Sequence, residues 1–112
     1  MILRRGLLAG SVAFSLAPTG LRAQAWPARQ IRVIAPYPPG GGIDTVSRAL
    51  SEKMAAKLGQ AMVVDNQPGA GATIGAAALA RSAPDGYTIM LGSMVDYSIA
   101  PFFHENLSFD MA

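Results

Sequence analysis

The sequence contains no cysteine and a single histidine, His104, among its 112 residues. Without cysteine, neither a disulfide framework nor a thiolate metal site can form. One histidine could bind a metal only together with carboxylates, and the acidic residues show no ligand spacing around it. We therefore expect no metal and no cofactor, and we assign His104 a surface or packing role.

Charged residues are also few, at 14% of the chain, and the formal net charge is +2. Three of the nine basic residues, Arg4, Arg5 and Arg22, lie within the first 25 positions. The rest of the chain has six basic residues against seven acidic ones, a net charge of −1. No basic patch remains there, which argues against a nucleic-acid partner.

The first 25 residues have the layout of a secretory signal peptide. Arg4 and Arg5 precede an uncharged apolar run, residues 6–17, which is too short to span a bilayer comfortably as a helix. An Ala-Gln-Ala triplet ending at Ala25 supplies the small residues that a signal peptidase requires. A membrane anchor or a buried helix is the alternative, and the cleavage site disfavours both. We predict export and cleavage after Ala25, with the paired arginines allowing a twin-arginine route.

Beyond position 30, strand-like and helix-like segments alternate. This order predicts an α/β fold with right-handed crossovers, in which helices cover a parallel sheet. Because only three strands are expected, at least one edge of the sheet should lack a neighbour. The predicted segments are a strand over 31–37, a helix over 44–58, a strand over 61–64, a helix over 73–81, a strand over 87–91 and a short helix over 98–103, broken at Pro101.

The first predicted helix is amphipathic. Its apolar stripe, of the kind that packs on a core, consists of Val46, Ala49, Leu50, Met54 and Leu58. Asp44 is the predicted N-cap, and Gly59 is the predicted residue at the C-terminal end.

Two glycine-rich segments follow the first two predicted strands, at 38–42 and 65–71. In a parallel α/β sheet, ligands bind at the carboxyl ends of the strands. Glycines there let the unpaired N–H groups of a helix N-terminus approach a carboxylate or a phosphate. For either segment alone, tight turns and close helix packing explain the glycines equally well, but two such segments at one sheet edge favour an anion site.

Motifs for other chemistries are absent from the sequence. The triplet Gly40–Gly42 is not followed by Gly-Lys-Ser/Thr, so it is not a P-loop. The spacing of Gly69, Gly71 and Gly75 misses the dinucleotide fingerprint by one residue. Ser47 and Ser93 have no neighbouring base, and no G-x-S-x-G elbow is present. We predict that the protein is not an enzyme; a small α/β enzyme acting on a phosphorylated substrate is the weaker alternative.

The sequence resembles the Bug-type receptors, the solute-binding proteins of tripartite tricarboxylate transporters. Several separate motifs occur in the family's order, and the resemblance covers essentially all of residues 26–109. The motifs are IRVIAPYPPGGGID at 31–44, LGQ at 58–60, VVDNQPGAG at 63–71, IGA at 74–76 and APDGYT at 83–88, with Trp-Pro at 26–27 as the usual mature start.

The resemblance implies a two-lobed periplasmic-binding-protein fold, a periplasmic location and capture of small organic anions such as di- and tricarboxylates. It also implies transporter membrane subunits as partners of a full-length receptor. Family members hold the ligand carboxylate by the two glycine segments. Carried over by position, the ligand-binding residues are Tyr37, Pro39, Gly40, Gly41, Gly42 and Asp44 in the first segment, Gly69, Ala70 and Gly71 in the second, and Ser93 after the third strand.

The chain departs from the family's pattern in length and at three positions. Ile43, Gln67 and Ala72 stand where Thr, Arg and Gly are frequent, which bears on the choice of ligand. Family members are roughly three times as long, by the usual size of a two-domain chain. We therefore expect residues 26–112 to be the N-terminal part of the first lobe, truncated before the second. A non-functional gene fragment is the alternative.

Overall fold

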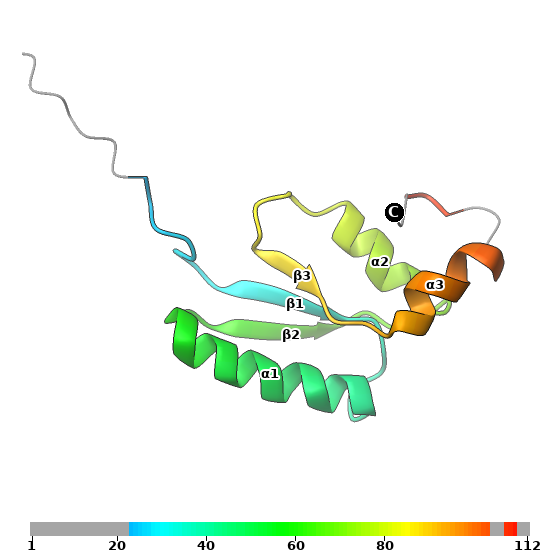
Figure 1. Cartoon of the computed structure of the whole chain (residues 1–112), viewed down its shortest axis with the longest axis horizontal. Helices are drawn as coiled ribbons and strands as arrows, with labels where there is room; N and C mark the ends of the chain where they lie inside the picture. Colours follow the sequence, from blue (N-terminus) through cyan, green and yellow to red (C-terminus); the bar gives the residue numbers. More distant parts are fainter. Residues whose placement is uncertain (1–22, 104–106, 110–112) are drawn as a thin grey trace, which may run out of the picture.

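The computed structural model describes residues 23–103 and 107–109 of the chain. In order, the elements are β1 (Ile31–Ala35), α1 (Gly42–Leu58), β2 (Met62–Asn66), α2 (Thr73–Ala80), β3 (Thr88–Met90) and α3 (Met94–Phe103) (Figure 1). This order confirms the predicted α/β class. Residues 1–22 of the predicted signal segment and His104 lie outside the described residues, and Ala23–Ala25 are exposed and belong to no helix or strand.

The three strands form a parallel sheet in the order β2-β1-β3. Val33, at the middle of β1, lies opposite Val64 of β2 on one side and Ile89 of β3 on the other. The central strand is accordingly the core of the molecule, because Ile31, Val33, Ile34 and Ala35 are each at most 3% exposed. A continuous β-branched run is typical of a strand that is covered on both faces.

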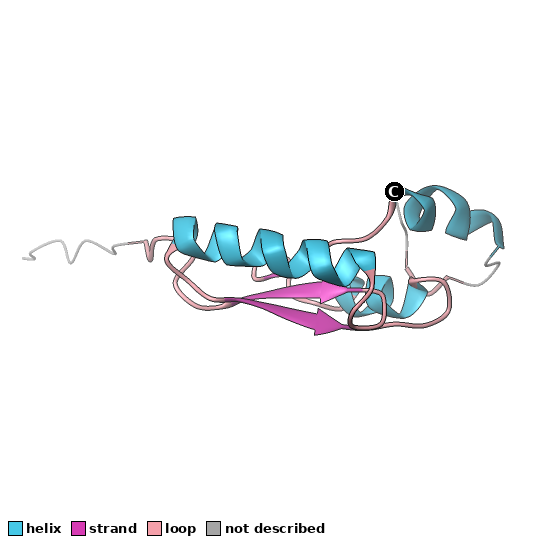
Figure 2. Cartoon of the chain, turned by 90° about the horizontal axis from the view of Figure 1, so that it is seen from below, coloured by secondary structure: helices cyan, strands magenta, loops and turns pink. Residues whose placement is uncertain are grey.

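Helices α1 and α2 lie on opposite faces of this sheet (Figures 1 and 2). Right-handed crossovers require this arrangement, because the chain moves from β1 to β2 in one direction and from β2 back past β1 to β3 in the other. The reversal makes the β1/β3 boundary a topological switch point. Ligands of open α/β sheets bind beside the carboxyl ends of the strands at such a point.

The predicted core-facing stripe of α1 is wrong. Val46 and Leu50 are 55% and 41% exposed, whereas the buried residues of the helix are Asp44, Ser47 and Ser51. These three lie on one face at helical spacing. The helix is rotated so that the carboxylate of Asp44 can reach the end of β2, as described below, and the small serines then pack against the sheet.

Several element boundaries also differ from the predictions. Strand β2 continues through Asn66, so the second glycine-rich segment begins two residues later than expected. Helix α3 begins at Met94, four residues before its predicted start, because Ser93 caps it: the Ser93 hydroxyl accepts a hydrogen bond from the Val95 N–H at 3.2 Å. The predicted end of α1 is confirmed, since Gly59 adopts a left-handed conformation and donates its N–H to the Ala55 carbonyl.

The N-terminal segment is anchored on Tyr87, at the start of β3 and far from the strand ends just discussed. The Tyr87 hydroxyl accepts a hydrogen bond from the Ala28 N–H at 2.7 Å. The Arg29 guanidinium lies 3.9 Å from the centre of the Tyr87 ring, and the Trp26 ring lies 6.0 Å from it. These contacts pin residues 26–29 to the amino end of the sheet. Within the described ranges, no helix is long and apolar enough to cross a membrane.

Ser47 provides a test of the packing between α1 and the sheet. It is 1% exposed, and its hydroxyl has no hydrogen-bond partner among the described residues. We expect Ser47→Ala to raise the free energy of unfolding by about 1 kcal/mol, because an unpaired buried hydroxyl is removed. Urea denaturation measures the change. As the matched control, Ser82→Ala should lower stability, because the Ser82 hydroxyl donates to the Ala78 carbonyl at 2.8 Å; a loss of stability in both variants would contradict this account.

Candidate functional site

The segments that follow the three strands meet at one edge of the sheet. The first loop, residues 36–41, joins β1 to α1; the second loop, residues 67–72, joins β2 to α2; residues 91–93 join β3 to α3. Parallel strands bring these three connections to the same edge (Figure 1). All ten residues predicted to bind a ligand lie in these connections or in the first turn of α1, so the fold brings them to one end of the sheet.

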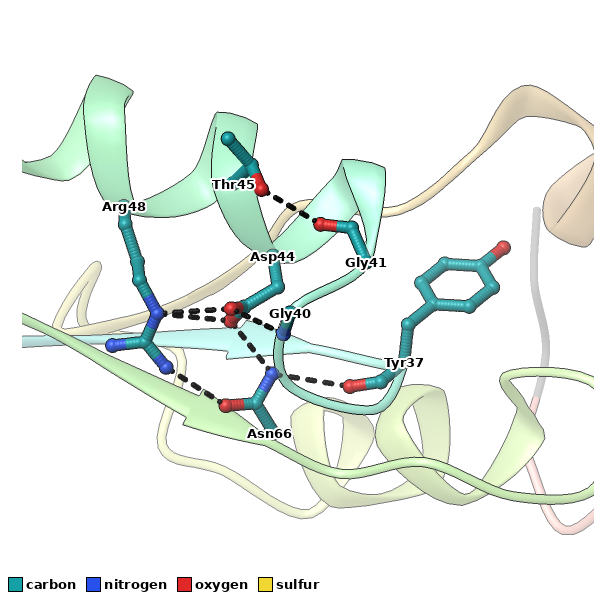
Figure 3. Close-up of polar contacts among 7 residues, drawn as sticks. All are labelled: Tyr37, Gly40, Gly41, Asp44, Thr45, Arg48 and Asn66. Atoms are coloured by element: carbon teal, nitrogen blue, oxygen red, sulfur yellow. Dashed lines mark hydrogen bonds and ion pairs between the residues drawn. The ribbon is translucent and has the colours of Figure 1, made fainter.

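The Asp44 carboxylate is the centre of the polar contacts at this edge (Figure 3). It is buried, and it accepts hydrogen bonds from the Gly40 N–H at 2.9 Å and from the Asn66 side-chain amide at 2.9 Å. The Arg48 guanidinium, one helical turn away, donates to both carboxylate oxygens at 3.0 and 3.1 Å. One side chain therefore ties the first loop, helix α1 and the end of β2 together.

Asp44 is not the N-cap that the sequence predicted. The helix begins one turn earlier, with Gly41 as N-cap in an extended conformation and no side chain capping it. Asp44 is the third residue of the helix, the position from which an acidic side chain can reach back to the N–H groups that precede the helix. The Arg48 hydrogen bonds, then the Gly40 N–H and the Asn66 amide, hold the pKa of Asp44 well below its usual range.

Asn66 is a site residue that sequence reasoning missed. Its amide donates to Asp44 and also to the Tyr37 carbonyl at 3.1 Å, and its amide oxygen accepts a hydrogen bond from Arg48 at 3.1 Å. The available signal was its place at the end of a strand, directly before a glycine-rich segment. Because the predicted strand ends at Val64, Asn66 was assigned to the loop, and its position at the end of β2 was missed.

Two of the three consecutive glycines at the end of the first loop and the start of α1 are not required by the fold. Gly40 has a φ of +89°, which favours glycine. In contrast, Gly41 has a φ of −79°, and a Cβ atom there would meet only the Pro38 carbonyl at 3.7 Å, an ordinary contact. A Cβ atom on Gly42 would lie in open space. The packing around Gly41 and Gly42 therefore does not explain why these two positions at the exposed N-terminus of α1 lack side chains.

The second loop is a run of left-handed residues. Residues 69–72 all have positive φ, with Ala70 at 48° and Ala72 at 68° among them. The Ala70 carbonyl accepts hydrogen bonds from the N–H and the hydroxyl of Thr73, and no side chain caps α2. Gly75 has a packing role, because a Cβ atom there would lie 2.8 Å from Pro36 of the first loop. The start of α2 therefore packs closely against the first loop.

An ion pair between β1 and β2 lies next to the start of the second loop and is linked to it by a hydrogen bond. The Arg32 guanidinium of β1 donates to Asp65 of β2, with Nε at 2.7 Å. Gln67, the first residue of the loop, donates to both oxygens of the same carboxylate at 3.1 and 3.3 Å. The Arg32 hydrogen bond is the main reason that the pKa of Asp65 is lowered. Gln67, one of the three departures from the family pattern, thus holds the loop by an internal contact.

Tyr37 links the first loop to the third connection. Its hydroxyl donates to Asp96 Oδ2, the atom that also accepts the Ser93 N–H at 2.9 Å. Burial, and next the hydrogen bond to Asp96, raises the pKa of Tyr37 to about 12. Asp96 was not predicted as a site residue, since it lies in a stretch that showed no clear helical start. In the part of the chain that the structure describes, no group of three His, Cys, Asp or Glu residues is placed to hold a metal ion.

Sequence comparison matches residues 46–112 to the family described as "Tripartite tricarboxylate transporter family receptor". A UPF0065 protein of Bordetella pertussis is 39% identical over 99 residues, which are 88% of this chain and 31% of that protein. Protein BugT of the same organism is 49% identical over 71 residues, 63% of this chain and 22% of that protein. The chain therefore spans about a third or less of the length of these relatives.

Solved structures agree in fold. A structure described as a periplasmic transporter superposes with a TM-score of 0.74 at 41% identity, over 78% of this chain and 29% of that one. MatC from Rhodopseudomonas palustris with bound malate gives a TM-score of 0.72 at 35% identity, over 77% and 29%. An R. palustris protein with adipate gives 0.73 at 28% identity, over 78% and 29%. Each of these matches covers more than three quarters of this chain and less than a third of the other one.

The lowered pKa of Asp44 predicts how stability depends on pH. Its contribution is complete above the unfolded-state pKa of about 4 and is lost as the pH falls toward the lower folded-state value. We expect Asp44→Asn to be less stable than the native protein at pH 7, and the difference to shrink below about pH 4. Urea denaturation from pH 7 to pH 2 measures it. A difference that stays constant across this range would contradict the assignment, and Glu52→Gln, at an exposed position of the same helix, is the control.

Proposed function

We propose that this chain, which belongs to the tripartite tricarboxylate transporter receptor family, binds the carboxylate group of a small organic acid at the carboxyl ends of its strands. The contacts in this proposal are backbone N–H groups of Gly41, Gly42 and the second loop, on residues 69–71, rather than a cationic side chain. Tyr37, Pro39 and Ser93 border the site, and Asp44 holds its first loop in place. The binding event serves uptake of the acid, not its chemical conversion.

The bare N-terminus of α1 carries this proposal. Gly41 and Gly42 leave space that neither backbone conformation nor neighbouring atoms demand. A helix N-terminus with no side-chain cap has unpaired N–H groups and a positive dipole end, which together favour an anion. The second loop adds another uncapped helix start beside it. An internal packing role accounts for Gly75 but leaves Gly41 and Gly42 unexplained.

The similar structures with malate and with adipate support a carboxylate as the ligand class. Both compounds are dicarboxylic acids, and MatC is 35% identical to this chain over the shared part. Because the chain spans only about 29% of those structures, the second lobe, closure around the ligand and docking to membrane subunits belong to the proposal for the whole receptor.

Gly41→Val tests the site without disturbing the fold, because its φ of −79° suits valine and its Cβ has room. We expect the added side chain to cover the N–H groups and to weaken the binding of malate or adipate at least tenfold, about 1.4 kcal/mol. Isothermal calorimetry on the purified protein measures the affinity, with adipamide as the uncharged analogue that should not bind.

Ala56→Val is the control, since it places a valine at an exposed position near the other end of α1. It should leave the affinity unchanged. Equal affinity in Gly41→Val and the native protein would reduce the first loop to a structural turn. A cooperative thermal melt that neither acid shifts would contradict carboxylate binding by this chain.

Export is the second part of the proposal. In a Gram-negative host, we expect the periplasmic product to begin at Trp26, because the signal peptidase cleaves after Ala25. Intact-mass spectrometry of the periplasmic fraction identifies the N-terminus. Replacing Arg4 and Arg5 together by lysine should abolish export only if the twin-arginine route is used. Recovery of the uncleaved chain from the cytoplasm alone would overturn the signal-peptide assignment.

A further inference from the structure

Tyr37 is held from both of its neighbouring strands. Its carbonyl accepts the Asn66 amide at the end of β2, and its hydroxyl donates to Asp96 in the first turn of α3, beyond the end of β3. Because β1 lies between β2 and β3, this one residue joins all three strand ends. Figure 3 shows its ring pointing away from the Asp44 cluster, so the two attachments lie on opposite sides of the residue.

The contact with Asp96 spans the switch point of the sheet. Strands β1 and β3 lie side by side, and in open α/β sheets ligands bind where the connections that follow two such strands diverge. The Tyr37–Asp96 hydrogen bond is a side-chain link between the first loop and the first turn of α3, and the Ser93 side chain also interacts with the Tyr37 hydroxyl. Tyr97 packs over Gly92 at the same place, where a Cβ atom on Gly92 would lie 2.6 Å from its hydroxyl.

Asp96 also caps its own helix. Ser93 is the N-cap, and Asp96 three residues later accepts the Ser93 N–H at 2.9 Å, as the acidic residue of a capping box does, while the Ser93 hydroxyl accepts the Val95 N–H. The same oxygen, Oδ2, accepts the Tyr37 hydroxyl. The start of α3 and the position of the Tyr37 ring are consequently determined by one carboxylate.

We propose that Asp96 is a positioning residue of the ligand site, which acts through Tyr37 to hold the first glycine loop against the start of α3. The proposal deepens the function proposed above and rests on it, because the loop so held is the one that would bind the carboxylate. Tyr37 lies near the start of that loop, three residues before Gly40, and its hydroxyl, like that of any tyrosine, is protonated at neutral pH and available as a donor. A helix cap alone would not need the tyrosine.

Amide hydrogen exchange, followed by NMR on the full chain, tests this coupling without a ligand. We expect Tyr37→Phe and Asp96→Ala each to speed exchange of the Gly40 amide, which donates to Asp44 at 2.9 Å, about tenfold, since one hydrogen bond that holds the loop to α3 is lost. The double variant should be no faster than either single one, because both remove the same bond. Tyr37→Phe leaves the Ser93–Asp96 cap intact, so it separates positioning from capping even if Asp96→Ala folds poorly.

Asp96→Asn should partly restore the slow exchange, because its amide oxygen still accepts a hydrogen bond. Controls of the same chemistry lie at the other end of the sheet: Tyr87→Phe and Asp85→Asn should leave the loop amides unchanged. Unchanged exchange of the Gly40 amide in Tyr37→Phe, or additive acceleration in the double variant, would overturn the proposal and leave Asp96 as a helix cap.

Affinity for malate and adipate provides the second measurement, with the same variants and controls. Weaker binding in Tyr37→Phe with no change in Tyr87→Phe supports the positioning role. If the native protein binds neither acid, the proposed function fails, whereas the exchange rates still decide whether Asp96 positions the loop. The two failures are therefore distinguishable.

Discussion

The buried carboxylate of Asp44 is the interaction on which the rest of this structure depends. An ionised group in the interior is costly unless it is fully paired, and this one receives hydrogen bonds from a guanidinium, a side-chain amide and a backbone N–H. Its three partners come from α1 itself, β2 and the first loop. Satisfying the charge therefore fixes the rotation of α1, the path of the loop and the position of Asn66 at the same time, even though apolar side chains of α1 remain exposed as a result.

Much of the fold could be predicted from the sequence, because it depends on local signals. A β-branched run such as Ile31–Ala35 and a glycine such as Gly59 report on their own conformation. The wrong predictions concern contacts made at a distance. Hydrophobic spacing shows that Val46 and Leu50 share a face, but not whether that face or the one carrying Ser47 meets the sheet. The hydrogen bonds of Asp44 with Gly40 and Asn66 determine which face of α1 meets the sheet.

The site residues also fall into those that local sequence indicates and those whose roles depend on contacts between distant segments. The two glycine segments were recognisable because their composition indicates backbone that a ligand can approach. Asn66 and Asp96 were not, since an Asn at a strand end and an Asp in a helix turn are common for many reasons. Their roles arise only when the order β2-β1-β3 brings them to either side of Tyr37. A residue that acts through a spatial neighbour leaves little trace in a single sequence.

An acidic residue beneath a proposed carboxylate site appears contradictory, but the pairing of Asp44 resolves the conflict. Its charge is matched by Arg48 and stabilised further by Asn66 and the Gly40 N–H, so a ligand nearby meets a neutral cluster rather than an anion. The same pairing occupies Arg48, which is then not available as a cationic ligand contact. Attraction in the proposed site must consequently come from backbone N–H groups and helix dipoles, whose effect is short-ranged. Such a site holds a carboxylate by geometry and not by net charge, and this makes the exact position of the first loop, and hence of Tyr37, decisive for binding.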